Sequence, residues 1–236
     1  MSIHHPIYYI KIGHLLPFIV LKSRPGNKRG SRPGHVSYLV KILESPLLAT
    51  LPRYLAIKNY YNGSTGLAAI QKIKGSRITL SQKSPFYVRK VLEHLLADAL
   101  KEHKLKIKHI GAFKDAQHCK VAVESLSDSI VTNRDLYSVL KPYLAKINLA
   151  EYFGKSLFSF VKYSKDIKEY VINALFPLAS PDMFYEVNYD KELKKVSILV
   201  DSNKAGIILW AGAAEVLLAQ KLCGVEIEIN ETDKNK

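Results

Sequence analysis

The residues best equipped for chemistry are cations near the start of the chain. Residues 1–92 hold 15 Lys and Arg but a single acid, Glu44, whereas residues 93–236 hold 20 residues of each sign. The entire net charge of +14 therefore belongs to the first 92 residues. A one-sided basic segment is typical of polyanion binders, and RNA is favoured over an anionic membrane because no amphipathic basic helix is visible.

Residues 23–34, SRPGNKRGSRPG, form the most cationic stretch and contain no apolar residue. Its two Arg-Pro-Gly turns leave the charged heads exposed, which indicates a phosphate-contacting loop. A flexible linker is the alternative interpretation. The candidate RNA contacts in the basic segment are Arg24, Lys28, Arg29, Arg32, Arg53, Lys72, Lys74 and Arg77.

Catalytic and metal-binding patterns are weak throughout the sequence. Residues 153–156, FGKS, end like a phosphate-binding loop, but the glycine required five residues before Gly154 is Leu149. The eight histidines have no cysteine partners at metal-ligand spacing. We therefore expect no catalytic residue, metal, cofactor or small-molecule substrate.

The cysteine content and hydropathy bear on the compartment. Cys119 and Cys223 are far apart and neither has a CxxC partner, which favours reduced thiols. No apolar run approaches the roughly 18 residues that a transmembrane helix needs. We expect a cytoplasmic protein, or one of an organelle matrix or stroma, without a membrane partner.

Short β segments separated by turn signals dominate the basic part. They predict an OB-like five-stranded barrel. The segments are residues 7–12, 18–21, 35–42, 47–51, 67–73 and 77–81.

A mixed pattern of helices and strands follows the barrel. Ser84 and Pro85 suit the start of a helix over residues 86–96, whose predicted apolar face is Phe86, Val88, Val91, Leu92, Leu95 and Leu96. Strands are predicted at 106–110 and 119–123 with a turn at 113–117. A helical stretch over 135–153, a strand over 157–161 and a helix from 163 to 175 come next.

The last part, residues 196–229, has the most informative pattern. A strand leads into Asp201-Ser202-Asn203, which are good helix starters, and a small-residue turn follows at residues 210–213, WAGA. A second helix then runs to Gly224, and residues 225–229 alternate as a strand. Strand, helix, tight turn, helix and strand form the core of a KH domain, which grips single-stranded RNA at the turn.

This segment resembles the second KH domain of the bacterial transcription factor NusA without a gap from residue 200 to 229. The Tyr163-Ser164-Lys165-Asp166 step and the Asn173-Ala174-Leu175 ending are also similar, and the resemblance extends over about residues 47–229. It implies an α+β protein with a small OB-like barrel followed by two type II KH domains of order αββααβ. The implied domains are 1–83, 84–162 and 163–230, with a disordered tail at 231–236.

The resemblance implies an RNA-binding factor in transcription elongation, termination or antitermination. Single-stranded RNA is the expected partner, and RNA polymerase and ribosomal proteins are the candidate protein partners. The residues before about 35 leave no room for the family's polymerase-docking domain, so any polymerase contact would use another surface. The alternative is a structural scaffold of a ribosome or other RNA–protein particle, with KH folds used for protein docking.

Both predicted KH turns depart from the family. The GxxG position falls on residues 210–213 and near residues 140–143, and neither has glycine at its ends. Pro142 also removes a backbone donor. Lys141, Tyr143, Lys204 and Trp210 could still contact RNA by charge or stacking, or else cap and pack the helices.

Overall fold

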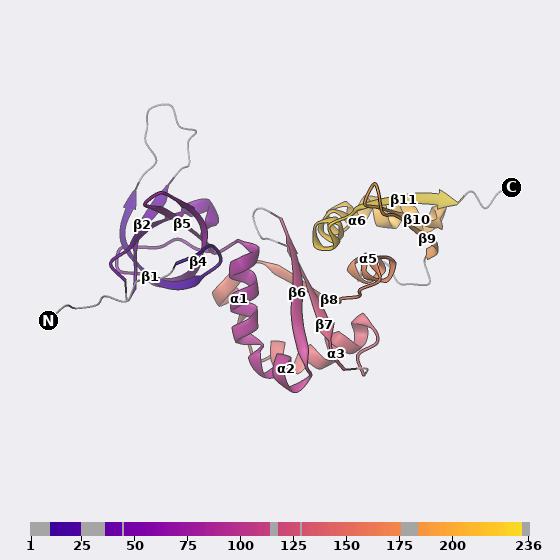
Figure 1. Cartoon of the computed structure of the whole chain (residues 1–236), viewed down its shortest axis with the longest axis horizontal. Helices are drawn as coiled ribbons and strands as arrows, with labels where there is room; N and C mark the ends of the chain where they lie inside the picture. Colours follow the sequence, from indigo (N-terminus) through magenta and orange to yellow (C-terminus); the bar gives the residue numbers. More distant parts are fainter. Residues whose placement is uncertain are drawn as a thin grey trace, which may run out of the picture. The chain divides into compact units, whose positions relative to one another are not determined.

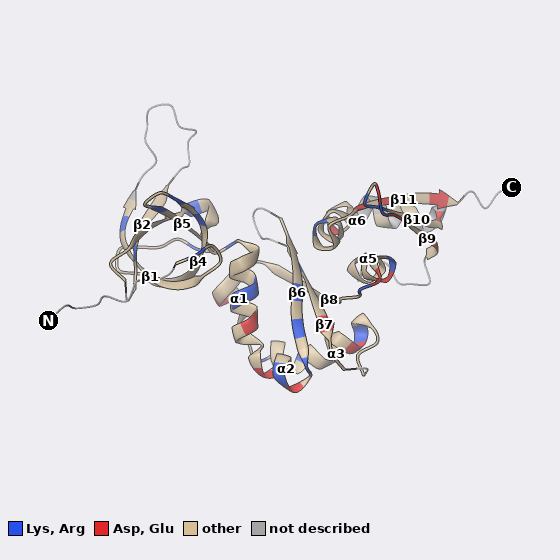
Figure 2. Cartoon of the chain, viewed as in Figure 1, with Lys and Arg blue, Asp and Glu red and all other residues tan. Residues whose placement is uncertain are grey.

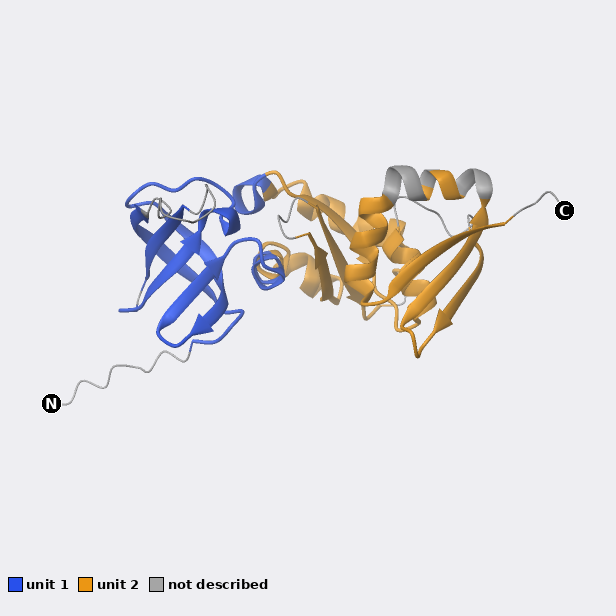
Figure 3. Ribbon diagram, turned by 90° about the horizontal axis from the view of Figure 1, so that it is seen from above, with its two compact units in different colours: residues 1–91, 150–154 blue, residues 92–149, 155–236 orange. Residues whose placement is uncertain are grey.

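The computed structural model describes residues 10–24, 36–43, 45–113, 118–127, 129–175 and 184–232. It does not describe the side chains of Arg24 and of helix residues 202–204, 207 and 209–212. The chain divides into two compact units (Figure 3). The first comprises residues 1–91 with 150–154, and the second comprises residues 92–149 with 155–236. The predicted α+β class is confirmed.

The first unit contains a closed five-stranded barrel in the order β1-β2-β3-β5-β4 (Figure 1). Antiparallel β1–β4 pairing and one parallel β3–β5 bridge, Thr50 to Thr79, close it. The predicted segments from residue 18 onward correspond to its strands. The segment predicted at residues 7–12 is wrong in its described part, because residues 10–12 form no strand and residues 12 and 13 make a turn; residues 7–9 lie outside the described part. The strands are β1 (Leu15–Arg24), β2 (Ser37–Ile42), β3 (Leu48–Pro52), β4 (Thr65–Lys74) and β5 (Arg77–Ser81).

The alternation of side chains explains why these segments close into a barrel. In β2, Tyr38, Val40 and Ile42 point inward and are buried, while Lys41 points to solvent. The same rule buries Phe18, Leu51 and other strand residues in one cluster. The cationic side chains are therefore left on the outside.

Helix α1 (Pro85–Leu95) follows the barrel as predicted, and Ser84 Oγ accepts a hydrogen bond from the Tyr87 amide at 3.2 Å. Its predicted apolar face is partly wrong. Phe86 is exposed, and Tyr87 is buried in its place. The Tyr87 hydroxyl donates to the Tyr152 carbonyl at 2.9 Å, and its ring meets Phe153 edge to face, so that α4 (Leu149–Phe153) contributes to the barrel unit.

The second unit begins with a three-stranded sheet of order β6-β7-β8. Its strands are β6 (Leu105–Ala112), β7 (His118–Ser125) and β8 (Leu157–Lys162), and β8 runs parallel to β7. Helix α2 (Ala97–Glu102) precedes them, and α3 (Asn133–Leu144) packs against β8. The predicted strands are confirmed.

The helical stretch predicted over 135–153 is two helices, α3 and α4, with a break at residues 145–148. The turn predicted near residues 140–143 is therefore wrong, since those residues lie within α3. Pro142 has no backbone N–H to donate to the helical hydrogen-bond ladder, and α3 ends two residues after it. A capping box between Thr132 and Asp135 fixes the other end of α3.

A second three-stranded sheet, of order β11-β10-β9, completes the unit. Its strands are β9 (Phe184–Asp190), β10 (Lys195–Asp201) and β11 (Glu226–Thr232), accompanied by α5 (Ile167–Leu175) and α6 (Ser202–Cys223). Gly224 ends α6 with φ +71°, as predicted.

The turn predicted at residues 210–213 is wrong, because α6 runs without a break through all 22 of its residues. Ala211, Ala213 and Ala214 favour a helix more than any other residue type, while Gly212 disfavours it by only about 1 kcal/mol. No residue of α6 is proline. One long helix thus occupies the place of the predicted helix pair.

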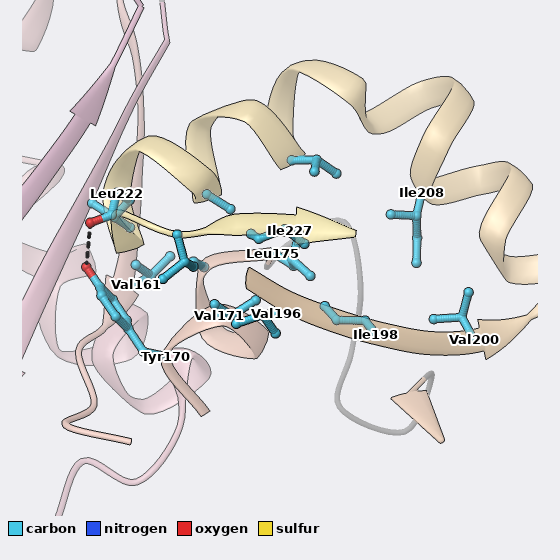
Figure 4. Packing of buried hydrophobic residues seen from close by; sticks show 14 of the residues in the cluster. Val161, Tyr170, Val171, Leu175, Val196, Ile198, Val200, Ile208, Leu222 and Ile227 are labelled. Carbon is cyan, nitrogen blue, oxygen red and sulfur yellow. Dashed lines mark hydrogen bonds between the residues drawn. The ribbon is translucent and has the colours of Figure 1, made fainter. Parts of the chain in front are cut away.

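The two sheets of the second unit share one apolar core. Ala122 of β7 and Val161 of β8 pack in the same cluster as residues of α5, α6, β10 and β11. Figure 4 shows this packing, with the Tyr170 hydroxyl donating to the Leu222 carbonyl at 3.3 Å. The face of β6 approaches α6 at Gly111, where an added Cβ would lie 2.9 Å from the Leu218 carbonyl oxygen.

Candidate nucleic-acid interface

The described part of the barrel, residues 10–24, 36–43 and 45–84, contains Lys and Arg but no Asp or Glu. Figure 2 shows these strands with blue segments and no red ones, whereas both colours occur on the second unit. These cations have no acidic partner within the described barrel. They are Lys11, Lys22, Arg24, Lys41, Arg53, Lys58, Lys72, Lys74, Arg77 and Lys83.

Three of the predicted contact residues lie together on one hairpin. Lys72 and Lys74 are exposed and alternate on the outer face of β4, and the β4–β5 register pairs Lys74 with Arg77. Gly75 at the hairpin turn has φ +57°, a conformation that glycine adopts without strain. The hairpin therefore presents three cations side by side, in an arrangement suited to a phosphate backbone.

Arg53 lies apart from this hairpin, in the short helix η1 (Arg53–Leu55) that follows β3. Its Nε donates to Asn59 Oδ1 at 3.0 Å. It also lines an open pocket of about 590 Å³ together with Tyr38, Tyr60, Tyr61 and neighbouring residues. The sequence predicted Arg53 as a contact but not these aromatic neighbours.

The remaining predicted barrel contacts can be placed only in part. Arg24 is the last residue of β1, where it pairs with Ser37, and its side chain is not described. Lys28, Arg29 and Arg32 lie outside the described residues.

The predicted contacts in the second unit are dispersed. Lys141 is exposed on α3, while Lys204 and Trp210 lie in α6 with side chains that are not described. Tyr143 donates its hydroxyl to Glu102 and lies 3.3 Å from His103 Nε2. The bond to Glu102 raises the pKa of Tyr143, and the contacts show that this tyrosine packs against α2.

A groove that the sequence did not reveal runs along β8 beside α3. Its volume is about 590 Å³, and exposed Arg134 and Tyr137 stand three residues apart on the α3 side. A cation next to an aromatic ring can bind a base and its phosphate. The other lining residues are mostly apolar: Leu144, Leu149, Ser156, Leu157, Phe158, Ser159 and Phe160.

One lysine of the second unit, Lys120, has a structural role. Lys120 is fully buried, and its ammonium lies 2.8 Å from Glu215 Oε2 and donates to the Ala174 carbonyl at 2.6 Å. Burial lowers the pKa of Lys120, and Glu215 acts in the opposite direction. This lysine joins β7 to α5 and α6 and is out of reach of any ligand at the surface.

The described part of the chain offers neither a cluster of metal ligands nor a membrane-spanning helix. Its His, Cys, Asp and Glu side chains form no group of three that could hold a metal ion. None of the helices formed by these residues is long and apolar enough to cross a bilayer.

No protein-family model matches the chain. The chain does match a curated relative. Over 193 residues the chain is 27% identical to the transcription termination/antitermination protein NusA of Thermus thermophilus. The alignment covers 78% of this chain and 47% of that NusA, so the chain spans about half the length of the curated relative it matches.

Two solved structures show a weaker likeness. The crystal structure of APE1850 has a TM-score of 0.38 and 17% identity, covering 58% of this chain and 96% of APE1850. The a/eIF2alpha-aDim2p-rRNA complex from Pyrococcus horikoshii has a chain with a TM-score of 0.26 and 14% identity, covering 41% of this chain and 64% of that one.

Proposed function

We propose that the chain binds single-stranded RNA, mainly through its barrel, as a NusA-like factor in transcription elongation, termination or antitermination. The observation that carries this proposal is the charge of the barrel surface, where every charged residue that the structure describes is a cation. Such a surface attracts any phosphate backbone, whereas an acidic protein substrate would also need shape-specific contacts. The similarity to NusA favours RNA as the polyanion.

The proposed domains follow the order of the elements. The strand order 1-2-3-5-4 of the barrel supports an OB-type domain at residues 1–83. The order of elements supports a type II KH domain at residues 84–162. In this part α1 and α2 precede the strands β6 and β7, and α3, α4 and the parallel strand β8 follow them. Residues 163–230 would form a second, altered KH domain in which α6 replaces the helix pair, and residues 231–236 would be a tail.

Within this proposal the contacts fall into two groups. The β4–β5 hairpin, Arg53, Arg24 and the loop cations Lys28, Arg29 and Arg32 would neutralise phosphates. Lys141, Lys204 and Trp210, together with Arg134 and Tyr137 at the groove, would add contacts in the second unit. The barrel carries the larger share, because residues 93–236 hold as many acids as cations.

A charge-reversal experiment on the full chain tests the role of the barrel. The triple variant Lys72→Glu, Lys74→Glu, Arg77→Glu should weaken binding of a single-stranded RNA by at least tenfold in moderate salt. Its plot of log affinity against log salt should be flatter by about 2, since each lost phosphate contact removes about 0.7. Fluorescence anisotropy at several salt concentrations measures both quantities.

The matched control reverses three exposed lysines of the second unit, Lys101, Lys165 and Lys191, and changes the net charge equally. It should retain most of the affinity and the salt slope. Equal losses in the two triple variants would mean that only net charge matters, and would contradict a barrel interface.

The transcription role needs its own test, because RNA binding alone does not separate it from a scaffold role in a ribosome or other RNA–protein particle. Affinity purification of the tagged chain should recover RNA polymerase subunits. Recovery of ribosomal proteins without polymerase would support the scaffold instead.

A further inference from the structure

The pocket beside Arg53 has the features of a binding site in its own right. It opens on the barrel surface where β1 ends, β2 begins and residues 59–62 pass, and its volume of about 590 Å³ is within the usual range for small-ligand sites. Its lining residues include three tyrosines and one arginine but no acid. The ligand it suits is therefore flat, and neutral or negatively charged.

Buried groups fix the floor of this pocket. The rings of Tyr38 and Tyr60 are almost fully buried and meet edge to face, with centroids 5.7 Å apart. The Tyr38 hydroxyl accepts a hydrogen bond from the Tyr60 amide at 3.3 Å, and the Tyr60 hydroxyl accepts one from Gln82 Nε2 at 2.8 Å. Because these hydrogen bonds and the ring contact fix both tyrosines, the floor of the pocket is preorganised for a ligand.

The rim carries an aromatic ring that the fold does not bury. Tyr61 is 77% exposed, yet its backbone is fixed, since its amide donates to Ser64 Oγ at 3.1 Å and its carbonyl accepts from the Ser64 amide at 3.0 Å. Gly63, with φ +83°, makes the tight turn that allows both bonds. A large exposed ring on a rigid turn is available for a base to stack on.

Arg53 and Asn59 supply the polar side of the pocket. Because Arg53 Nε donates to Asn59 Oδ1 at 3.0 Å, the plane of the guanidinium is set and its terminal NH₂ groups are directed away from that bond. These groups can bind a phosphate oxygen, and the Asn59 and Asn62 amides can donate to and accept from the edge of a base. Ring, cation and amides thus match the parts of one nucleotide.

We propose that this pocket binds a single unstacked nucleotide, with its base on Tyr61 and its phosphate on Arg53. This inference rests on the proposed function and adds to it a base-recognising site on the barrel. Single-stranded RNA can supply such a nucleotide, whereas a duplex cannot, because duplex bases are stacked and paired. A protein segment is disfavoured, because the pocket offers neither an apolar anchor site nor an acid for a basic side chain.

The test uses the full chain and fluorescein-labelled ten-nucleotide RNAs, one of natural composition and a set with a single abasic site at successive positions. Tyr61→Ala should weaken binding of the natural RNA by about tenfold, whereas Tyr61→Phe should retain affinity within about threefold. For the wild type, an abasic site at one or two positions should weaken binding similarly. Tyr61→Ala should be insensitive to those same sites.

Tyr54→Ala is the matched control, since Tyr54 is an exposed tyrosine of the barrel that does not line the pocket. It should bind like the wild type. Unchanged affinity in Tyr61→Ala, or equal losses in Tyr54→Ala and Tyr61→Ala, would overturn the pocket while leaving RNA binding by the barrel intact. Loss of a copurifying protein from Tyr61→Ala without loss of RNA affinity would also overturn it. If the wild type binds no RNA, the proposed function itself fails.

Discussion

The two units use lysine and arginine in opposite ways. In the second unit several lysines are paired with acids, as in Lys108–Glu124 at 3.3 Å, Lys162–Glu169 at 3.0 Å and Lys195–Glu228 at 3.2 Å. In the described part of the barrel no acid is available for such pairs. The balance of signs, rather than the number of lysines, therefore distinguishes the described barrel from the second unit.

The units also differ in how their cores are built. The barrel encloses a cluster made by its own strands and η1. The second unit has one cluster to which both three-stranded sheets contribute, with α6 contacting β6 and β7 as well as β10 and β11. Damage to the shared core should therefore destabilise both sheets together.

The largest expected effect comes from the buried cation. Lys120→Ala should lower the free energy of unfolding by about 3 kcal/mol, because it leaves the Glu215 carboxylate without its partner and opens space in the core. Lys72→Ala on the barrel should change it by less than about 0.5 kcal/mol. Urea denaturation followed by circular dichroism measures both.

A double variant sharpens this contrast. Lys120→Met with Glu215→Leu removes both charges and should recover much of the loss, because replacing a buried ion pair by apolar residues is often neutral. A single Lys120→Ala variant as stable as Lys72→Ala would contradict the structural role assigned to Lys120.

The shared core is tested by the close approach of β6 to α6. In Gly111→Ala the added Cβ would lie 2.9 Å from the Leu218 carbonyl oxygen and 3.0 Å from the Leu222 amide nitrogen, so the backbone of α6 must move. We expect a loss of about 1–3 kcal/mol in unfolding free energy.

Gly206→Ala provides the control within the same helix. Its Cβ would meet nothing within 4 Å, and alanine favours a helix over glycine by up to about 1 kcal/mol. This variant should therefore be as stable as the wild type or more stable. Equal losses at the two glycines would show that β6 and α6 do not pack as closely as described.

Sequence patterns predicted most of the strands, although they missed β9 and placed a strand at residues 10–12, and they predicted the two KH turns wrongly. Alternation in β2 is visible because one face is buried, and Gly224 ends α6 because only a left-handed residue fits there. A break at residues 210–213 was expected from resemblance to a family, while the local preference of three alanines is helical.

The candidate site shows a similar division. Net charge located the cationic barrel from sequence alone, because charge adds up without any knowledge of the fold. The pocket cannot be predicted from the sequence, because Tyr38, Arg53 and Tyr61 come together only in the folded barrel. For the same reason, Lys120 looked like any other lysine until the structure placed it in a core between β7 and α6.

The smallest expected effect concerns alkaline pH. Burial raises the pKa of the Cys223 thiol from 9.0 to about 12, so the unfolded chain loses this proton first as the pH rises. The contribution of the protonated thiol to the free energy of unfolding is complete below about pH 9 and is lost as the pH approaches 12. By pH 10, about 1.4 kcal/mol of this contribution has been lost. Between pH 8 and pH 10, urea midpoints should therefore fall further for the wild type than for Cys223→Ala. The difference between the two proteins is the relevant quantity, because Lys120, whose pKa burial lowers, changes stability in the opposite direction with pH. Parallel curves for the two proteins would show that the thiol ionises as readily in the folded chain as in the unfolded one.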